Sequence, residues 1–109
     1  MRPPPLEWDD QKDARRFHRV PADTSATLVS SALGRVATQV LDLSQGGCRM
    51  RTNVRCEGGD RFVLKFDAIG PKSVTVAWRR DDGAGNAEVG LHFAEPLSWS
   101  LVEEIALRS

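Results

Sequence analysis

Three arginines near the N-terminus are the residues of this sequence best suited to binding an anion. Arg15, Arg16 and Arg19 lie within one short segment, separated by Phe17 and His18. A guanidinium is planar and always charged, so it can fork onto phosphate oxygens or stack on a nucleobase. Arginine also pairs with the guanine edge that carries O6 and N7. The cluster predicts a phosphate or nucleotide site, and the alternative is a solvated basic turn that pairs with the acidic residues before it.

A second polar segment, Asp42-Leu43-Ser44-Gln45-Gly46-Gly47, could bind the opposite edge of guanine. Asp42 and Ser44 occupy alternate positions, which project to the same side of an extended chain. A carboxylate accepts two parallel N–H bonds, the pattern that guanine N1–H and N2–H2 offer, and a hydroxyl can donate or accept. Gly46 or Gly47 allows a positive φ and the close approach of a ligand. A plain turn is the alternative, because Asp, Ser and Gly are common turn residues.

Together these segments resemble the two motifs of the PilZ domain family, whose members are receptors for the bacterial second messenger cyclic di-GMP. The first motif, RxxxR, matches residues 15–19, and the second, [D/N]xSxxG, matches residues 42–47. Residues 76–80 and 89–93 are also similar to the final hairpin of the family. The resemblance covers about residues 13–107.

The resemblance implies a mainly all-β fold, a six-stranded antiparallel β-barrel followed by a short C-terminal α-helix. It implies that the N-terminal arginine segment wraps onto the barrel beside the second motif. By this analogy, two arginines bind phosphate and guanine while a third assists, an Asp and a Ser bind guanine, and a Gly shapes the turn. The residues implied to bind cyclic di-GMP are Arg15, Arg16, Arg19, Asp42, Ser44 and Gly47.

The function that the resemblance implies is a non-catalytic receptor or adaptor. Cyclic di-GMP would order the N-terminal arginine segment, and the changed surface would signal to a protein partner. One alternative is an interaction module with the PilZ fold that binds no nucleotide. Another is a small barrel for single-stranded nucleic acid, which is disfavoured because the net charge is zero and most aromatic residues follow the core pattern. The sequence leaves open the affinity, the choice between one nucleotide and a stacked pair, and the downstream partner.

Short strands separated by turn residues must position these motifs. Apolar residues alternate with polar ones, which is typical of half-buried strands. Trp78 falls on the core phase of its strand and His92 on the outer phase. Strands are predicted at residues 25–31, 35–43, 48–51, 61–67, 73–78 and 89–93, with turns near 32–34, 46–47, 57–60, 70–71 and 81–86.

The last segment changes to a helical period. Leu97, Leu101 and Ile105 are spaced four apart, so they share one face of a helix. Either Ser98 or Ser100 could cap its start. We expect this helix to pack across an open end or one face of the barrel.

The chain of 109 residues fits one domain, predicted at residues 14–109 after a Pro-rich tail at 1–13 that contains Trp8. No GxSxG, Walker A or GxGxxG motif occurs, so no enzyme activity and no catalytic residues are expected. Cys48 and Cys56 form no CxxC pair, so neither a metal nor a resident cofactor is expected.

The remaining predictions concern location and assembly. The sequence lacks a run of about 18 apolar residues and a signal-peptide pattern, so a cytoplasmic protein without membrane insertion is expected. Its expected partners are cyclic di-GMP and an unidentified protein effector, with no nucleic acid. The protein is expected to be a monomer or a weak homodimer.

Overall fold

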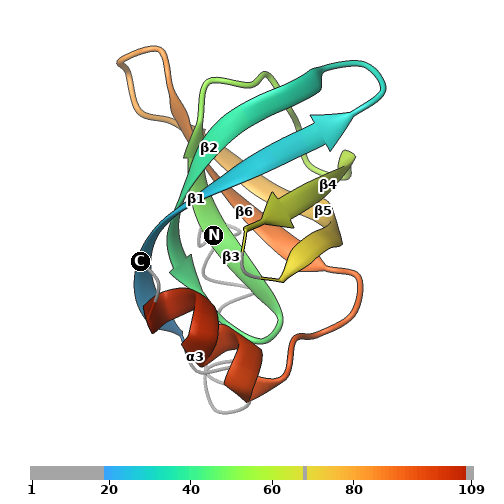
Figure 1. Cartoon of the computed structure of the whole chain (residues 1–109). Helices are drawn as coiled ribbons and strands as arrows, with labels where there is room; N and C mark the ends of the chain where they lie inside the picture. The colour runs from blue at the N-terminus through green and yellow to red at the C-terminus, as the bar shows by residue number, and fades with distance from the viewer. Residues whose placement is uncertain (1–18, 68, 108–109) are drawn as a thin grey trace.

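Six segments with alternating apolar residues form strands in the computed structural model, which describes residues 19–67 and 69–107 (Figure 1). The predicted tail, its Trp8 and the proposed domain boundary lie outside the described residues. The elements are β1 (Val20–Ser30), β2 (Gly34–Leu43), β3 (Gly47–Thr52), β4 (Arg61–Phe66), β5 (Gly70–Asp81), β6 (Ala87–Phe93) and α3 (Trp99–Leu107).

The strands close into an antiparallel barrel with the order β1-β2-β3-β6-β5-β4, in which β4 pairs back with β1. Closure satisfies strand edges that would otherwise stay unpaired. The predicted fold class is therefore confirmed, including the short C-terminal helix.

The barrel interior is filled by one residue in two from each strand. Val40, Met50, Leu64, Val89 and Leu91 have no exposed surface, and they belong to one continuous apolar core. In β3 and β6 the predicted alternation holds throughout, with Cys48 and Met50 inside and His92 exposed outside. The period-two pattern therefore identified the core-facing residues of these strands correctly.

A β-bulge in β2 turns Asp42 away from this core. Val40 pairs with Met50, whereas Asp42 pairs with Arg49, so the register shifts by one residue at Leu41. A bulge of this kind reverses the face on which the following side chains lie. Val40 on one side of the bulge remains buried in the core, and Asp42 points to the outer surface.

A second bulge, in β5, does the same for Trp78. Val76 pairs with the core residue Leu91, and Trp78 pairs with Gly90, which lies on the outer side of β6. Trp78 is only 8% exposed, yet it is not part of the core cluster. The prediction that Trp78 is buried is thus confirmed, but the bulge places its ring on the outer face, outside the continuous core cluster.

Gly90 provides the space that this tryptophan fills. A Cβ at position 90 would lie 2.2 Å from Nε1 of Trp78, far inside van der Waals contact. The ring is therefore buried by packing flat against backbone on the outside of the barrel. Among the described residues its indole N–H has no hydrogen-bond partner.

The helix lies across one end of the barrel, beside the start of β1 (Figure 1). Ser98 is its cap, since the Leu101 N–H donates to Ser98 Oγ at 3.2 Å. Leu97 precedes the helix instead of lying on its face, and it is buried with Val102 and Ile105. The predicted helical face is confirmed for Leu101 and Ile105, whereas Leu97 lies before the Ser98 cap.

The turns agree with the predictions except at the β4–β5 connection. Gly34 has a φ of +74° in the β1–β2 turn, and the β5–β6 connection begins after Asp81. The turn predicted at Gly70–Pro71 falls earlier, because Pro71 already pairs with Lys65 in β5. Gly70, with a φ of +81°, begins the strand.

Candidate functional site

Four neighbouring strands bring one row of residues together on the outer face of the barrel. Asp42 of β2 lies opposite Arg49 of β3. Arg49 in turn lies opposite Gly90 of β6, and Gly90 lies opposite Trp78 of β5. Paired residues share a face of the sheet, so the two bulges bring Asp42 and Trp78 into one row.

Ion pairs extend along and beside this row, and we call their five members the ladder: Arg19, Asp42, Arg49, Glu88 and Arg80. The Arg19 guanidinium donates to Asp42 Oδ1. Arg49 donates from Nε to Asp42 Oδ2 at 2.9 Å and from Nη1 to Glu88 Oε1 at 3.0 Å. Arg80 Nη2 donates to the same Glu88 oxygen at 2.9 Å. The ladder therefore runs without interruption from the residue before β1 to the end of β5.

The ladder changes the titration of its central members. Burial by itself lowers the pKa of Arg49, but the neighbouring Asp42 and Glu88 carboxylates outweigh it and the pKa is raised. Burial likewise raises the pKa of Glu88, but bonds from Arg80 and Arg49 outweigh it and the pKa is lowered. Both groups are thus held in their charged forms, and the three guanidiniums and two carboxylates leave the ladder with a net positive charge.

Arg80 also contacts the aromatic residue of the row. Its guanidinium carbon lies 5.8 Å from the centre of the Trp78 ring, within the range of a cation–π interaction. The row and the ladder are consequently joined at this end. The outer face of these strands offers cations, one carboxylate edge at Asp42 and planar groups, which are the features that bind a phosphorylated purine.

The turn of the second motif is built by hydrogen bonds between its own residues. The Ser44 N–H donates to the Gly47 carbonyl at 2.8 Å, and the Ser44 hydroxyl bonds to both the N–H and the carbonyl of Gly47 at 3.2 Å. Ser44 is 2% exposed. In this structure its hydroxyl therefore holds the turn closed next to Asp42.

Gly47 is required by packing and not by its φ angle. Neither Gly46 nor Gly47 is among the glycines with positive φ, so the conformational freedom noted in the sequence is not used there. A Cβ at Gly47 would lie 2.0 Å from the Leu91 carbonyl oxygen. What approaches Gly47 closely is thus the backbone of β6, because β3 begins there directly against its partner strand.

The same turn is attached to the start of the helix. The Leu97 N–H donates to the Gln45 carbonyl at 2.8 Å, and Gln45 Nε2 donates to the Leu97 carbonyl at 3.0 Å. The Phe93 N–H donates to the Gly46 carbonyl at 2.9 Å. The second motif is therefore fixed to both β6 and the segment that leads into α3.

The structure brings together part of the predicted site. Arg19 and Asp42, 23 residues apart, form an ion pair, and the Ser44–Gly47 turn follows Asp42 directly. Arg15 and Arg16 lie outside the described residues. Sequence reasoning missed Arg49, Glu88 and the outward position of Trp78. Alternation placed Arg49 outside, but its pairing with Asp42 depends on the bulge.

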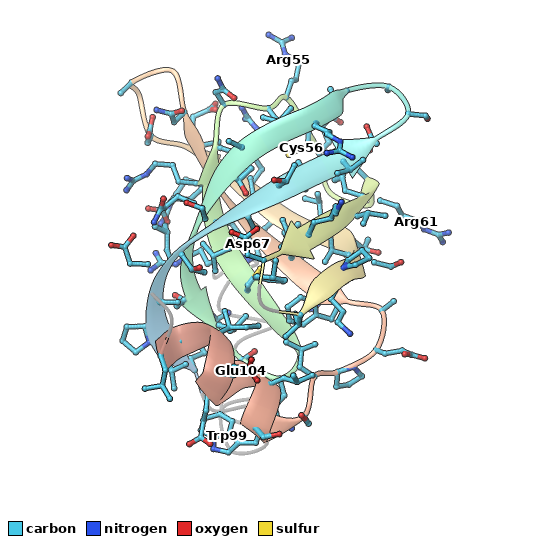
Figure 2. The ribbon with its side chains drawn as sticks, viewed as in Figure 1. Arg55, Cys56, Arg61, Asp67, Trp99 and Glu104 are labelled. Atoms are coloured by element: carbon cyan, nitrogen blue, oxygen red, sulfur yellow. The ribbon has the colours of Figure 1, made fainter. Side chains whose placement is uncertain are left out.

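Three surface hollows, with volumes of about 540, 430 and 620 Å³, have no ladder residue in their linings. The first is lined partly by Arg61 and the third partly by Arg55, and both side chains extend outward from the barrel (Figure 2). The described residues contain no group of His, Cys, Asp or Glu arranged to hold a metal ion. Within residues 19–67 and 69–107 there is also no helix with the length and apolar character needed to cross a membrane.

Comparison with known proteins gives a family and a set of similar folds. The family model of the PilZ domain matches residues 13–106. Among solved structures, the Bacillus subtilis inhibitor of motility MotI/DgrA has a TM-score of 0.61 at 12% identity, over 86% of this chain and 48% of that one. YcgR from Escherichia coli in complex with c-di-GMP has a TM-score of 0.57 at 14% identity, over 84% and 42%.

The PilZ domain of YcgR with c-di-GMP gives a TM-score of 0.56 at 14% identity, over 84% of this chain and 85% of that one. The chain thus spans less than half of MotI and of full YcgR, and most of the isolated domain. At these identities the likeness concerns the fold. Comparison with curated proteins gave no match.

Proposed function

This chain belongs to the PilZ domain family, and we propose that it is a non-enzymatic receptor for cyclic di-GMP. The observation that carries the proposal is the contact between Arg19 and Asp42, which joins the last arginine of the first motif to the carboxylate of the second. Both groups are only partly exposed, at 23% and 17% of their side-chain surface. They therefore present a defined edge to a ligand at the outer face of the barrel.

Asp42 retains the capacity to bind guanine while it is paired with the arginines. An ionised carboxylate has about four acceptor positions, two on each oxygen. Arg19 occupies one position on Oδ1 and Arg49 one on Oδ2. Within the part of the chain that the structure describes, these two bonds leave one position per oxygen, which suits the parallel N1–H and N2–H2 donors of guanine.

The cations of the site suit the rest of the ligand. Cyclic di-GMP carries two phosphates, and a guanidinium binds phosphate oxygens in a forked geometry. We propose that Arg15 and Arg19 bind phosphate and guanine with help from Arg16, and that Ser44 and Gly47 complete the guanine site. Because Ser44 is buried in its turn, we expect its contribution to come mainly from holding that turn in place.

Ligand binding would then be converted into a signal at the surface. We propose that the N-terminal arginine segment becomes ordered over the barrel when the nucleotide binds, and that a protein effector in the cytoplasm recognises the changed surface. We expect the receptor to be a monomer or a weak homodimer, which light scattering with and without nucleotide would determine. Backbone amide resonances of residues 13–19 that are unchanged by saturating nucleotide would contradict the ordering step.

Calorimetric titration with cyclic di-GMP tests the receptor function, with GTP and cyclic GMP as controls for selectivity. Removing one charge-assisted hydrogen bond costs about 1.5–3 kcal/mol, so Asp42→Ala and Arg19→Ala should each weaken binding about 10- to 150-fold. Asp67→Ala and Arg61→Ala are matched controls, because they remove exposed charges away from the ladder. Equal affinities for all four variants would overturn the proposal.

The second candidate is a PilZ-fold interaction module that binds no nucleotide. One observation favours it: Asp42 already has two guanidinium partners within the protein, so its charge is compensated by residues of the chain itself. Folded wild-type protein that releases no heat and gains no thermal stability with cyclic di-GMP would decide for this alternative. The titration would also separate one bound nucleotide from a stacked pair through its stoichiometry.

A further inference from the structure

We infer that Arg49 and Glu88 are positioning residues for guanine recognition, acting through Asp42. This inference rests on the proposed function, because it explains how the carboxylate is kept open for a base. Neither residue belongs to the two sequence motifs. Their role follows from the register of β2, β3 and β6 and from the directions of their hydrogen bonds.

Arg49 uses two different nitrogens for two different carboxylates. Nε donates to Asp42 at 2.9 Å, and Nη1 donates to Glu88 at 3.0 Å. The side chain is 35% exposed, and Asp42 and Glu88 are 17% and 20% exposed. A planar guanidinium bound at two points has a fixed orientation, so it presents a single N–H to Asp42.

This single bond determines what Arg19 can do. A carboxylate without another partner readily accepts two parallel bonds from one guanidinium. If Arg49 were absent, Arg19 could form this parallel pair itself, in the geometry that guanine N1–H and N2–H2 would use, and so compete with the base for Asp42. With Arg49 on Oδ2, Arg19 is confined to Oδ1. Arg49 therefore prevents Arg19 from forming the parallel pair of bonds to Asp42 that guanine needs.

Glu88 has the opposite charge to the residues expected around an anionic ligand. Its carboxylate lies beside the site and repels phosphate, so simple electrostatics assigns it an unfavourable effect on binding. Its contacts are with Arg49 and Arg80, which it holds on the outer face. We assign Glu88 the role of holding Nη1 of Arg49, so that Nε of the same guanidinium points to Asp42.

The test compares affinities for cyclic di-GMP and cyclic di-AMP, which share two phosphates and differ in their bases. Arg49→Gln should lose about 10-fold or more for cyclic di-GMP, the equivalent of one charge-assisted bond, and its preference for guanine should fall. Arg51→Gln is the matched control: it removes the same charge from the same face of β3, two residues away. It should change affinity less than about 2-fold and leave the preference unchanged.

The direction in which Glu88→Ala changes the affinity for cyclic di-GMP distinguishes two possible roles of Glu88. Removing an anion beside the site should tighten binding if Glu88 acts only through its charge. If Glu88 positions Arg49, Glu88→Ala should weaken cyclic di-GMP binding several-fold and reduce the guanine preference. Glu88→Gln, which keeps an acceptor oxygen for Arg49, should restore most of both. Circular dichroism and the thermal midpoint would confirm that each variant is folded.

The outcomes separate this inference from the function on which it rests. Wild-type protein that binds neither nucleotide would overturn the receptor function itself. Wild-type binding together with unchanged or tighter binding by Glu88→Ala would overturn the positioning role alone. Equal losses in Arg49→Gln and Arg51→Gln, with the guanine preference intact, would also overturn it, because both variants would then act through net charge.

Discussion

The inner and outer faces of β2, β3, β6 and β5 are built from alternating residues of the same strands, yet they depend on different physical properties. Inside, Val40, Met50 and Val89 are completely buried and need only to fill the barrel. Outside, Arg49 lies between two core residues of β3 and makes directed bonds to two carboxylates. A core residue interacts with many neighbours, whereas a ladder residue depends on one or two.

The two faces should respond differently to mutation. Apolar burial is non-directional and scales with area, so the inner face determines stability. Partly exposed ion pairs add little stability because water screens them, but their geometry is specific. We therefore expect mutations of the inner face to unfold the protein and mutations of the outer face to alter binding in a barrel that remains folded.

The largest effect should come from a cavity on the inner face. Leu91 is fully buried in β6, so Leu91→Ala should lower the free energy of unfolding by about 2–5 kcal/mol. Urea denaturation would measure it, with Arg51→Ala on the outer face as the comparison, expected within about 0.5 kcal/mol of wild type. Similar losses in the two variants would contradict the division between the faces.

The next effect concerns Gly47, where the second motif meets the inner backbone. Gly47→Ala would place a Cβ 2.0 Å from the Leu91 carbonyl oxygen, and relief is limited because the three nearest atoms all belong to the β6 backbone. Overpacking of this kind costs about 1–3 kcal/mol, so the thermal midpoint should fall. Gly58→Ala is the control, because its Cβ would find its nearest neighbour at 3.7 Å and its φ is not positive. A stable Gly47→Ala barrel that fails to bind nucleotide would instead assign the glycine to the ligand.

The inner face was predictable from the sequence because it follows a simple period. Core residues of β3 and β6 alternate without interruption, and glycines mark the turns after β1 and before β5. A closed barrel with a C-terminal helix followed from six such segments and the family motifs. Burial is averaged over many contacts, so the pattern remains clear even when single residues depart from it.

The outer face was only partly predictable because it depends on two bulges. Strict alternation places Asp42 on the same face as Val40, and Trp78 on the same face as Val76. One extra residue in each strand reverses both assignments. The motifs singled out Arg19 and Asp42, which the structure brings into contact. A bulge is set by pairing between strands, which the local sequence pattern does not predict. Arg49 and Glu88 were missed for this reason.

Cys48, on the inner face, should make the stability of the barrel depend on pH. Burial raises the pKa of the Cys48 thiol to about 12 from an ordinary value of 9.0, and the nearby Asp42 raises it further than burial alone while Arg19 opposes the change. A raised folded-state pKa gives stability that is complete below pH 9 and is lost as the pH rises toward 12. The free energy of unfolding should therefore fall by about 1 kcal/mol per pH unit above pH 9.

Cys48→Ala tests this slope. Urea denaturation would be measured from about pH 8 to about pH 10.5, the range in which the thiol of the unfolded chain ionises. The variant should be less stable at every pH because it leaves a cavity, but its stability should decline less steeply above pH 9 than that of wild type. Parallel curves would show that the thiol ionises as readily in the folded as in the unfolded protein.

The smallest effect is the corresponding titration on the outer face. Although burial acts to raise the pKa of Glu88, bonds from Arg80 and Arg49 lower it below its ordinary value of 4.5. A lowered folded-state pKa gives stability that is present above 4.5 and is lost as the pH falls through the folded value. Because these pairs are partly exposed, the loss should amount to only about 0.2–1 kcal/mol. Glu88→Gln should remove it, whereas Glu103→Gln, an exposed carboxylate on α3, should retain it. A Glu88→Gln curve parallel to wild type in acid would mean that the ladder orients the site without stabilising the barrel.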